Sequence, residues 1–230
     1  MSDEGTRLTG IQRAMAGAMK RSWDEIPHFA EVTQIDAEPV LDRLDACRKA
    51  APVDAPRVTI NDLLVHAVTR ALSEDPRFNV LFDGKTIKQC DGVNLAVAIA
   101  TDNGLMTPVL RDAHTHDIYA MAAALREKAD RARAWKLAPD EFDGAVMTVS
   151  NLGKFDVDSG FPVINQRQTA LLFMGSIKKR PFVINDAVVA RKTAYLTLAS
   201  DHRIIDGVTA ASFLERIIGH FTGRSAANDA

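Results

Sequence analysis

The stretch YLTLASDHRIIDGVTAASFLERI, residues 195–217, changes its periodicity within a few positions. Its first part is apolar and rich in β-branched and aromatic residues, which is typical of a buried strand. From Gly207 the apolar residues recur at helical spacing and predict a closing helix to Phe221. The junction between these two elements holds four charged or titratable residues: Asp201, His202, Arg203 and Asp206. Because a strand end presents side chains from a rigid scaffold, this junction is the first candidate for a functional site.

The N-terminal segment TGIQRAMAGAMKRSW predicts a helix. Met15, Met19 and Trp23 fall on one stripe, and Thr9 precedes it as a candidate cap. We expect the methionines of this stripe to pack in the core.

The segments that follow predict a strand and two helices. HFAEVTQID alternates every two residues, as a strand does, and a helix follows from about Glu38 to Ala50. Thr59 and Asp62 form a capping-box pattern at the start of a long helix, which Pro76 ends.

The second half of the chain is dominated by extended segments. FNVLFDG, GVNLAVAIATDNG, LMTPVL, AVMTVSNLG and TALLFMGSI predict sheet strands, and a hairpin turns at Asn185 and Asp186. One further helix runs from about Ile118 to Ala134. This irregular order of elements favours an α+β fold, with a large mixed β-sheet flanked by helices, over a doubly wound fold. We expect one domain over residues 1–230, with flexible ends at about 1–5 and 222–230.

The composition narrows the class of partner. With 28 basic and 30 acidic residues, the net charge is −2, which disfavours nucleic acid and anionic membranes as partners. No apolar run is long enough for a membrane-spanning helix. Cys47 and Cys90 lie far apart and without metal-ligand spacing, so we expect reduced thiols, no bound metal and a cytoplasmic location.

His202 is a candidate general base. Histidine exchanges protons near neutral pH, and a catalytic histidine needs a neighbour that fixes its ring. Asp206 could steady the loop or cap the following helix. The alternative is a structural histidine held by a nearby aspartate, and spacing by itself leaves both alternatives open.

Ser150 is the second candidate. It ends the β-rich run VMTVS, so its hydroxyl could donate a hydrogen bond to a developing oxyanion in a cleft. The G-x-S-x-G elbow of a hydrolase nucleophile is missing around it. The alternative is a turn serine bonded to its own backbone.

Several motifs in succession carry a family resemblance. DHRIIDG, together with TGIQRAMAGAMKRSW, IPHF, TINDLLVHAV, NGLMTPVLRDA and RARAWKLAPDEFDGAVMTVSNLGKF, resembles the catalytic domain of the dihydrolipoamide acyltransferases, the core components of 2-oxo acid dehydrogenase complexes. The similarity runs from about Thr6 to Phe221. Chloramphenicol acetyltransferase is similar more distantly, through a His-x-x-x-Asp-Gly motif, so the resemblance implies a chloramphenicol acetyltransferase-like fold.

The resemblance implies acyl transfer between dihydrolipoamide and coenzyme A. His202 would take the proton of the attacking thiol, and Ser150 would donate to the oxyanion. Asp206 matches the family aspartate that holds the active-site loop through an ion pair with an arginine. Family members form trimers, in which the histidine and the serine of one site come from two subunits.

The coenzyme A site is also inferred from the resemblance. Asn151 and Ser176 match family positions together with Ser150, and Thr59 matches the residue that opens the TINDLL helix. Arg48 resembles a family arginine at the pantetheine channel, and Arg43 is the alternative for that role. INQRQTALL replaces the proline-rich turn usual in the family, which affects the expected contacts near Asn165.

Three further expectations concern the assembly and the substrate. The sequence contains no lipoyl domain, so the lipoyl group would be supplied in trans or by an absent part of the chain, alongside possible dehydrogenase complex components. The C-terminal HFTGRSAANDA differs from the apolar segment that joins family trimers into larger cores, which predicts an isolated homotrimer. SNLG, in place of Thr-Asn-Gly-Gly, favours acetyl over succinyl, with a branched-chain acyl group as the alternative. The rival functions are an acetyltransferase for a small-molecule acceptor and a non-catalytic scaffold subunit.

Overall fold

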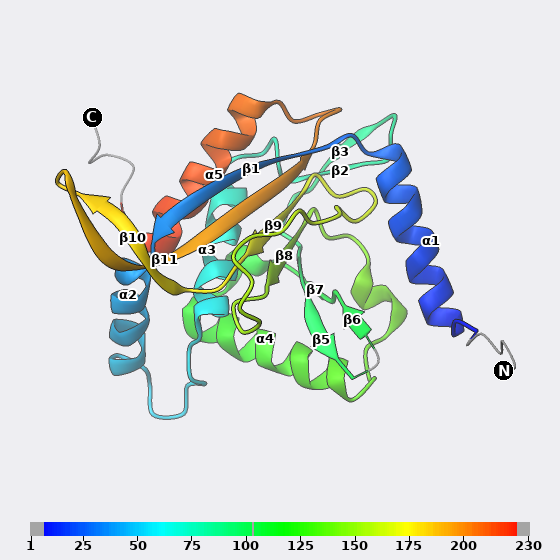
Figure 1. Ribbon diagram of the computed structural model, residues 1–230. Coiled ribbons are helices and arrows are strands. Elements are labelled where there is room, and N and C mark those ends of the chain that lie inside the picture. Colours follow the sequence, from blue (N-terminus) through cyan, green and yellow to red (C-terminus); the bar gives the residue numbers. More distant parts are fainter. Residues whose placement is uncertain (1–6, 103, 225–230) are drawn as a thin grey trace, which may run out of the picture.

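A seven-stranded mixed sheet forms the centre of the molecule, in a computed structural model that describes residues 7–102 and 104–224 (Figure 1). The strand order is β1-β11-β9-β8-β4-β7, and β10 pairs with the first half of β11. The β4–β8 and β8–β9 pairs are parallel and the others antiparallel, which confirms the predicted mixed sheet. The strands of this sheet are β1 (His28–Asp36), β4 (Leu95–Val97), β7 (Val109–Leu110), β8 (Met147–Asn151), β9 (Ala170–Met174), β10 (Lys178–Ile184) and β11 (Ala187–Asp201).

Helices cover one face of the sheet, with α3 at the centre of the layer and in contact with α2, α4 and α5. Nine of the fifteen residues of α3 are buried, so it forms the middle of the core. Phe78, just after α3, stacks on Phe213 of α5 with ring centroids 3.8 Å apart. The helices are α1 (Gly10–Glu25), α2 (Glu38–Lys49), α3 (Ile60–Glu74), α4 (Ile118–Arg133) and α5 (Gly207–Thr222), with short 3-10 turns η1 (Ala113–Thr115) and η2 (Pro139–Phe142).

The local capping signals in the sequence act as predicted. Thr59 caps α3 through a reciprocal box with Asp62, and α3 ends two residues before Pro76. The β10–β11 turn places Asn185 and Asp186 at φ values of 49° and 63°, a left-handed conformation that Asn and Asp tolerate. These elements follow from local chemistry, and their predicted bounds are confirmed to within one or two residues.

The expectation of a core stripe on α1 is wrong for the single chain. Met15, Met19 and Trp23 are 40%, 37% and 58% exposed, because α1 extends away from the body of the molecule (Figure 1). The end of α1 joins the body: the Ser22 hydroxyl donates to the Ile164 carbonyl. The stripe therefore lacks a partner surface within the described part of this chain.

Two of the segments predicted to join the main sheet form separate short ribbons instead. Two separate ribbons form beside the main sheet, where the sequence predicted sheet strands: β2 (Val80–Phe82) with β3 (Ile87–Gln89), and β5 (Ile99–Thr101) with β6 (Gly104–Met106). The exposed, polar β3 gave no strand signal in the sequence.

The C-terminal helix is longer than predicted. Thr222 belongs to α5 and is buried, so the flexible end expected from residue 222 is wrong at this position. Gly223 closes the helix in the left-handed region, at φ 75°. The rest of the two predicted flexible ends lies outside the described residues, apart from Gly223 and Arg224.

Among the described helices, none has the length and apolar character that a bilayer crossing requires.

Glu141 is a charged link between η2 and α4, and it predicts an acid-sensitive contribution to stability. Its carboxylate accepts from Lys128 Nζ and Arg131 Nη2, both at 2.5 Å, and from the Ala138 N–H at 2.9 Å. These bonds, with Lys128 the largest cause, lower the pKa of Glu141 from 4.5 to about 2. Because the folded pKa is depressed, the stabilisation is complete above pH 4.5 and is lost as the pH falls toward 2.

Replacing Glu141 with Gln removes the negative charge that Lys128 and Arg131 face, so the free energy of unfolding at neutral pH should fall. We expect a loss of about 1–2 kcal/mol, since solvent screens part of the interaction. The loss should shrink as the pH falls below about 4, as measured by urea unfolding across this range. Glu127→Gln, which alters a 66% exposed carboxylate facing the same arginine, is the matched control and should change little. A loss of equal size at every pH would contradict the ionic explanation.

Candidate active site

His202 follows the last residue of β11 and is held at the sheet end by two contacts. Its backbone N–H donates to the Pro27 carbonyl at 3.1 Å. Its ring lies against the ring of Phe29 of β1 in a tilted arrangement, with centroids 4.2 Å apart and an interplanar angle of 35°. The residue is nevertheless exposed. This confirms the predicted position at a strand end, with an imidazole that is both oriented and accessible to a substrate.

An ion pair within the DHR segment fixes the backbone on both sides of the histidine. Asp201 is 1% exposed, and its carboxylate accepts from the backbone N–H of Arg203 and from the guanidinium, with Nη2 at 2.6 Å. The Asp201 hydrogen bond raises the pKa of Arg203. The guanidinium also lies 4.8 Å from the centre of the Phe82 ring. These contacts tie the loop to the end of β11 and to the ring of Phe82.

Asp206 caps α5. Its carboxylate accepts from the Thr209 N–H at 2.8 Å, and this bond is the main reason that the pKa of Asp206 is lowered. Of the two roles left open by the sequence, helix capping is confirmed. The arginine ion pair implied by the resemblance is absent here: among the described residues, the nearby Arg77 pairs with Asp75 at 2.6 Å, and the loop arginine pairs with Asp201.

Ser150 lies in the middle of the sheet, as the penultimate residue of β8. It is half-buried, and no hydrogen bond to another described residue uses its hydroxyl. Two positions earlier on the same face, Thr148 donates to Gln168 at 2.6 Å and accepts from the Asn165 amide at 3.0 Å. A polar network thus supports this face of β8 and leaves the Ser150 hydroxyl available as a donor.

Within one chain, Ser150 and His202 are far apart. Ser150 pairs with Phe173 of β9, which pairs with Thr197 of β11, five residues before His202. At roughly 3.4 Å per residue and 4.8 Å per strand spacing, the two Cα atoms lie roughly 20 Å apart. Within one chain the two side chains are therefore too far apart to contact each other.

Asn151 and Ser176 lie near Ser150, at the ends of β8 and β9. Asn151 Oδ1 accepts from the Gly153 N–H at 2.8 Å and so shapes the turn after the strand. Ser176 is buried against the loop that joins β8 to β9: its N–H donates to the Val157 carbonyl at 2.7 Å, whereas its hydroxyl has no partner among the described residues. A Cβ added at Gly175 would lie 1.9 Å from the Asp158 carbonyl oxygen, so only glycine permits this close approach.

Arg48 and Thr59 form another predicted group. Arg48 Nε donates to the Val58 carbonyl at 2.9 Å, directly beside Thr59. The Thr59 hydroxyl itself donates to Asp62 at 2.8 Å. The alternative, Arg43, donates instead to the His220 carbonyl near the end of α5. The structure therefore places Arg48, and not Arg43, next to Thr59.

Two neighbours of His202 were not among the residues singled out from the sequence. Phe29 and Glu31 share one face of β1, and Phe29 supports the imidazole ring. Knowledge that β1 pairs with β11 would have pointed to both residues, because this pairing aligns His28 with Asp201, next to His202. Sequence periodicity predicts two strands but not that they are neighbours.

No cluster of three or more His, Cys, Asp or Glu side chains suited to a metal ion occurs within residues 7–102 and 104–224.

Comparison with known proteins identifies the family. Residues 2–223 match the profile of the 2-oxoacid dehydrogenases acyltransferase (catalytic domain) family. The acetyltransferase component of the Zymomonas mobilis pyruvate dehydrogenase complex is 33% identical over 90% of this chain and 47% of its own length. The lipoamide acyltransferase component of the Bacillus subtilis branched-chain alpha-keto acid dehydrogenase complex is 32% identical over 94% and 51%. The chain thus spans about half the length of these relatives.

Solved structures agree with this assignment. A probable dihydrolipoamide acetyltransferase from Listeria monocytogenes superposes with a TM-score of 0.90 at 31% identity, covering 100% of this chain and 98% of the other. Two structures at 28% identity share a TM-score of 0.89 and coverages of 96% and 92%. One was studied for the roles of a serine, a histidine and an asparagine in the catalytic mechanism of Azotobacter vinelandii dihydrolipoamide acetyltransferase, and the other is the cubic core of a pyruvate dehydrogenase complex.

A chloramphenicol acetyltransferase, at 16% identity and a TM-score of 0.59 over 88% of this chain and 94% of its own, supports the fold alone. With the mixed sheet, the strand-end histidine and the match over residues 2–223 together, the chain belongs to the 2-oxoacid dehydrogenase acyltransferase catalytic-domain family.

Proposed function

We propose that this domain transfers an acyl group between dihydrolipoamide and coenzyme A, with His202 as general base. The observation that carries the proposal is an exposed imidazole at a strand end, held by Phe29 and by the hydrogen bond to the Pro27 carbonyl. Family membership supports the reaction class, and both groups of relatives described above are named as acyltransferase components.

In the proposed mechanism, His202 removes the proton from the thiol of the attacking substrate. The thiolate adds to the thioester carbonyl, because the thiolate and not the thiol is the nucleophile. Ser150 donates a hydrogen bond to the negative oxygen of the tetrahedral intermediate. The intermediate collapses with loss of the second thiolate, which takes the proton back from the His202 imidazolium. Protons and charge balance without a redox step.

Coenzyme A and the lipoyl group act here as substrates. We assign Ser150, Asn151 and Ser176 at the ends of β8 and β9, and Arg48 with Thr59, to the coenzyme A side of the site. The unpartnered hydroxyl of Ser176 supports this, because a buried polar atom without a partner is costly unless a ligand supplies one. The lipoyl group would arrive on a domain in trans or on another part of the protein.

We further propose that the active unit is a homotrimer whose sites lie between subunits. The separation of roughly 20 Å between Ser150 and His202 along the paired strands supports a site completed by a second chain. So does the outward-facing stripe on α1, with Trp23 58% exposed. Large apolar side chains in such positions are typical of subunit contacts.

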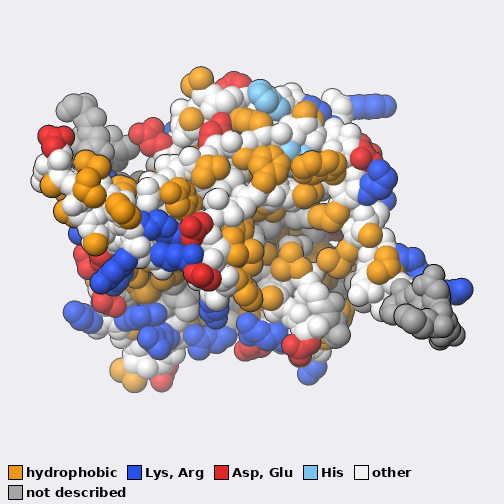
Figure 2. Space-filling model, in the orientation of Figure 1, with side chains coloured by type: hydrophobic (Ala, Val, Ile, Leu, Met, Phe, Trp, Pro, Cys, Tyr) orange, Lys and Arg blue, Asp and Glu red, His pale blue; other side chains and the backbone are white. Residues whose placement is uncertain are grey.

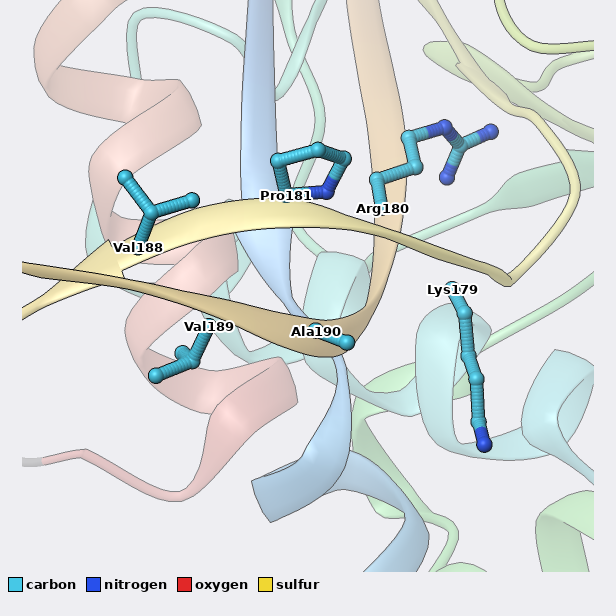
Figure 3. A pocket seen from close by; sticks show the side chains of 6 residues that line it. All are labelled: Lys179, Arg180, Pro181, Val188, Val189 and Ala190. Carbon is cyan, nitrogen blue, oxygen red and sulfur yellow. The ribbon is translucent and has the colours of Figure 1, made fainter.

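The β10–β11 hairpin is a second surface that supports association. Val183 and Val188 near its tip are 62% and 74% exposed, and Figure 2 shows hydrophobic side chains on this projection at the left of the molecule. Among the described strands, β10 pairs with β11 only, which leaves its outer edge free. A hollow of about 240 Å³ on the hairpin is lined by Lys179, Arg180, Pro181, Val188, Val189 and Ala190 (Figure 3).

The trimer predicts a mass of about 75 kDa in light scattering, three times the 25.1 kDa chain. Replacing Trp23 with Ser should shift the population toward monomer, whereas a matched change of the exposed Trp135 should not. A wild-type mass of 25.1 kDa would contradict the trimer. A closed core of many trimers would keep the trimeric unit and contradict the isolated trimer predicted from the sequence.

The function is tested by thiol release with free dihydrolipoamide and a panel of acyl-coenzyme A substrates. We propose acetyl as the preferred group, since several relatives are named acetyltransferase components. Branched-chain acyl is the alternative, because the branched-chain relative is about equally identical to this chain. Acetyl transfer to a small hydroxyl acceptor without use of dihydrolipoamide would favour the rival function, an acetyltransferase for a small-molecule acceptor. No transfer to either acceptor would favour a scaffold subunit.

For the cellular context, we propose a reducing, cytoplasmic compartment and association with other components of a dehydrogenase complex. Both cysteines are free thiols, which supports the first point. The acidic and basic residues nearly balance, so neither nucleic acid nor membrane is proposed as a partner.

A further inference from the structure

Glu31 places a carboxylate beside the candidate base. In β1 it lies two residues after Phe29, so both side chains leave the same face of the strand. The ring of Phe29 lies against the His202 ring with centroids 4.2 Å apart. A Cβ added at Gly207 would lie 3.8 Å from Glu31 Oε1, so the carboxylate also borders the first residue of α5.

One oxygen of the Glu31 carboxylate is buried without a hydrogen-bond partner in the part of the chain that the structure describes. Glu31 Oε2 is buried and has no hydrogen-bond partner among the described residues. Burial raises the pKa of the Glu31 carboxyl, whereas its own backbone N–H and the charge of a protonated His202 act in the opposite direction. A partly desolvated carboxylate with one buried oxygen that lacks a partner in this part of the chain costs stability, so a structural role does not account for it.

The surrounding elements offer few competing charges. On β11 the residues opposite Glu31 and Phe29 are Leu198 and Ser200. Of the other charged groups near the loop, Asp206 is bonded to the Thr209 N–H, and Arg203 is held by Asp201. His202 is therefore the titratable group on which the Glu31 charge acts most directly.

We propose that Glu31 is a positioning residue for His202, and that its carboxylate stabilises the imidazolium formed when the ring takes the thiol proton. This rests on the proposed acyl transfer and extends it. The interaction is reciprocal: a protonated His202 favours the ionised form of the Glu31 carboxyl to the same extent that the carboxylate favours the imidazolium. A rate enhancement of about tenfold corresponds to a modest charge interaction near a protein surface.

The test follows the ring directly. In protein labelled with ¹⁵N-histidine, the His202 signal is assigned by its loss in His202→Ala, and its titration is followed by NMR. In Glu31→Gln we expect the midpoint to move to lower pH, because the favourable interaction between the carboxylate and the imidazolium is lost. Glu31→Asp, which keeps the charge, should bring the midpoint part of the way back toward the wild-type value, and Glu127→Gln on the far helix α4 should leave it unchanged.

Kinetics and stability give two further readouts. Glu31→Gln should lower kcat by about tenfold with little change in KM for coenzyme A. Because the pKa of Glu31 is raised in the fold, its ionised form costs stability above that pKa, so Glu31→Gln should not lower the thermal midpoint at neutral pH.

A His202 midpoint that does not move in Glu31→Gln overturns the inference. The NMR measurement does not depend on turnover, so it decides the role of Glu31 even if wild-type protein transfers no acyl group. An inactive wild-type protein would contradict the proposed acyl transfer without deciding whether Glu31 acts on His202. A lower thermal midpoint in Glu31→Gln, with an unchanged His202 titration, would indicate a purely structural residue.

Discussion

Replacing His202 with alanine is expected to lower kcat for acyl transfer by about a thousandfold. The variant keeps the thioester and the oxyanion donor but has no group to take the thiol proton, and at neutral pH only a few per cent of an ordinary thiol is ionised. Since the lost step is the creation of the nucleophile, the rate of the variant should recover partly at high pH, where the thiol ionises without help.

The fold of this variant should be intact, because the ring is exposed and its main contact is the face of Phe29. Circular dichroism and mass are compared with those of wild type to show this. His116→Ala, at a half-buried position before α4, is the matched control and should retain wild-type kcat. A rate in His202→Ala within tenfold of wild type, without a pH dependence that differs, would remove His202 from the mechanism.

Replacing Ser150 with alanine is the second large effect. One oxyanion donor contributes a factor of about 100–1000 to kcat, so a loss of that size is expected, with KM for coenzyme A changed much less. The hydroxyl makes no hydrogen bond to another described residue, so its removal should not unfold the strand. Ser212→Ala, on the exposed face of α5, should leave the rate unchanged.

Mixing the two inactive variants tests where the site lies. If His202 and Ser150 of each site come from two subunits, denatured and co-refolded His202→Ala and Ser150→Ala chains should recover about one quarter of wild-type activity. Each site then needs an intact histidine from one chain and an intact serine from the next, and each is present with a chance of about one half. If both groups acted from one chain, the mixture would stay as inactive as its parents.

Much of the fold was predictable because its signals are local. The capping boxes at Thr9 and Thr59, the Asn185–Asp186 turn and the alternation of residues 28–36 each depend on neighbours within a few positions. The predicted elements that failed are those whose state depends on distant partners. The α1 stripe reads as a core face in the sequence, yet no element of the described chain covers it.

The residues of the candidate site also fall into those that local patterns predict and those that depend on distant partners. Short-range patterns were enough to name the candidate groups and their places: an imidazole after a buried strand, a serine at a strand end and an aspartate just before a helix. Each follows from periodicity and short-range hydrogen bonds.

Which of these groups lie together depends on the pairing of strands that are distant in the sequence. Strand pairing brought Phe29 and Glu31 to His202 and set Ser150 roughly 20 Å away. It placed Arg48, rather than Arg43, beside Thr59, and it made Asp201 rather than Asp206 the partner of the loop arginine. The physical reason is that strand order and register arise from burying one continuous core, a property of the whole chain that no short segment contains.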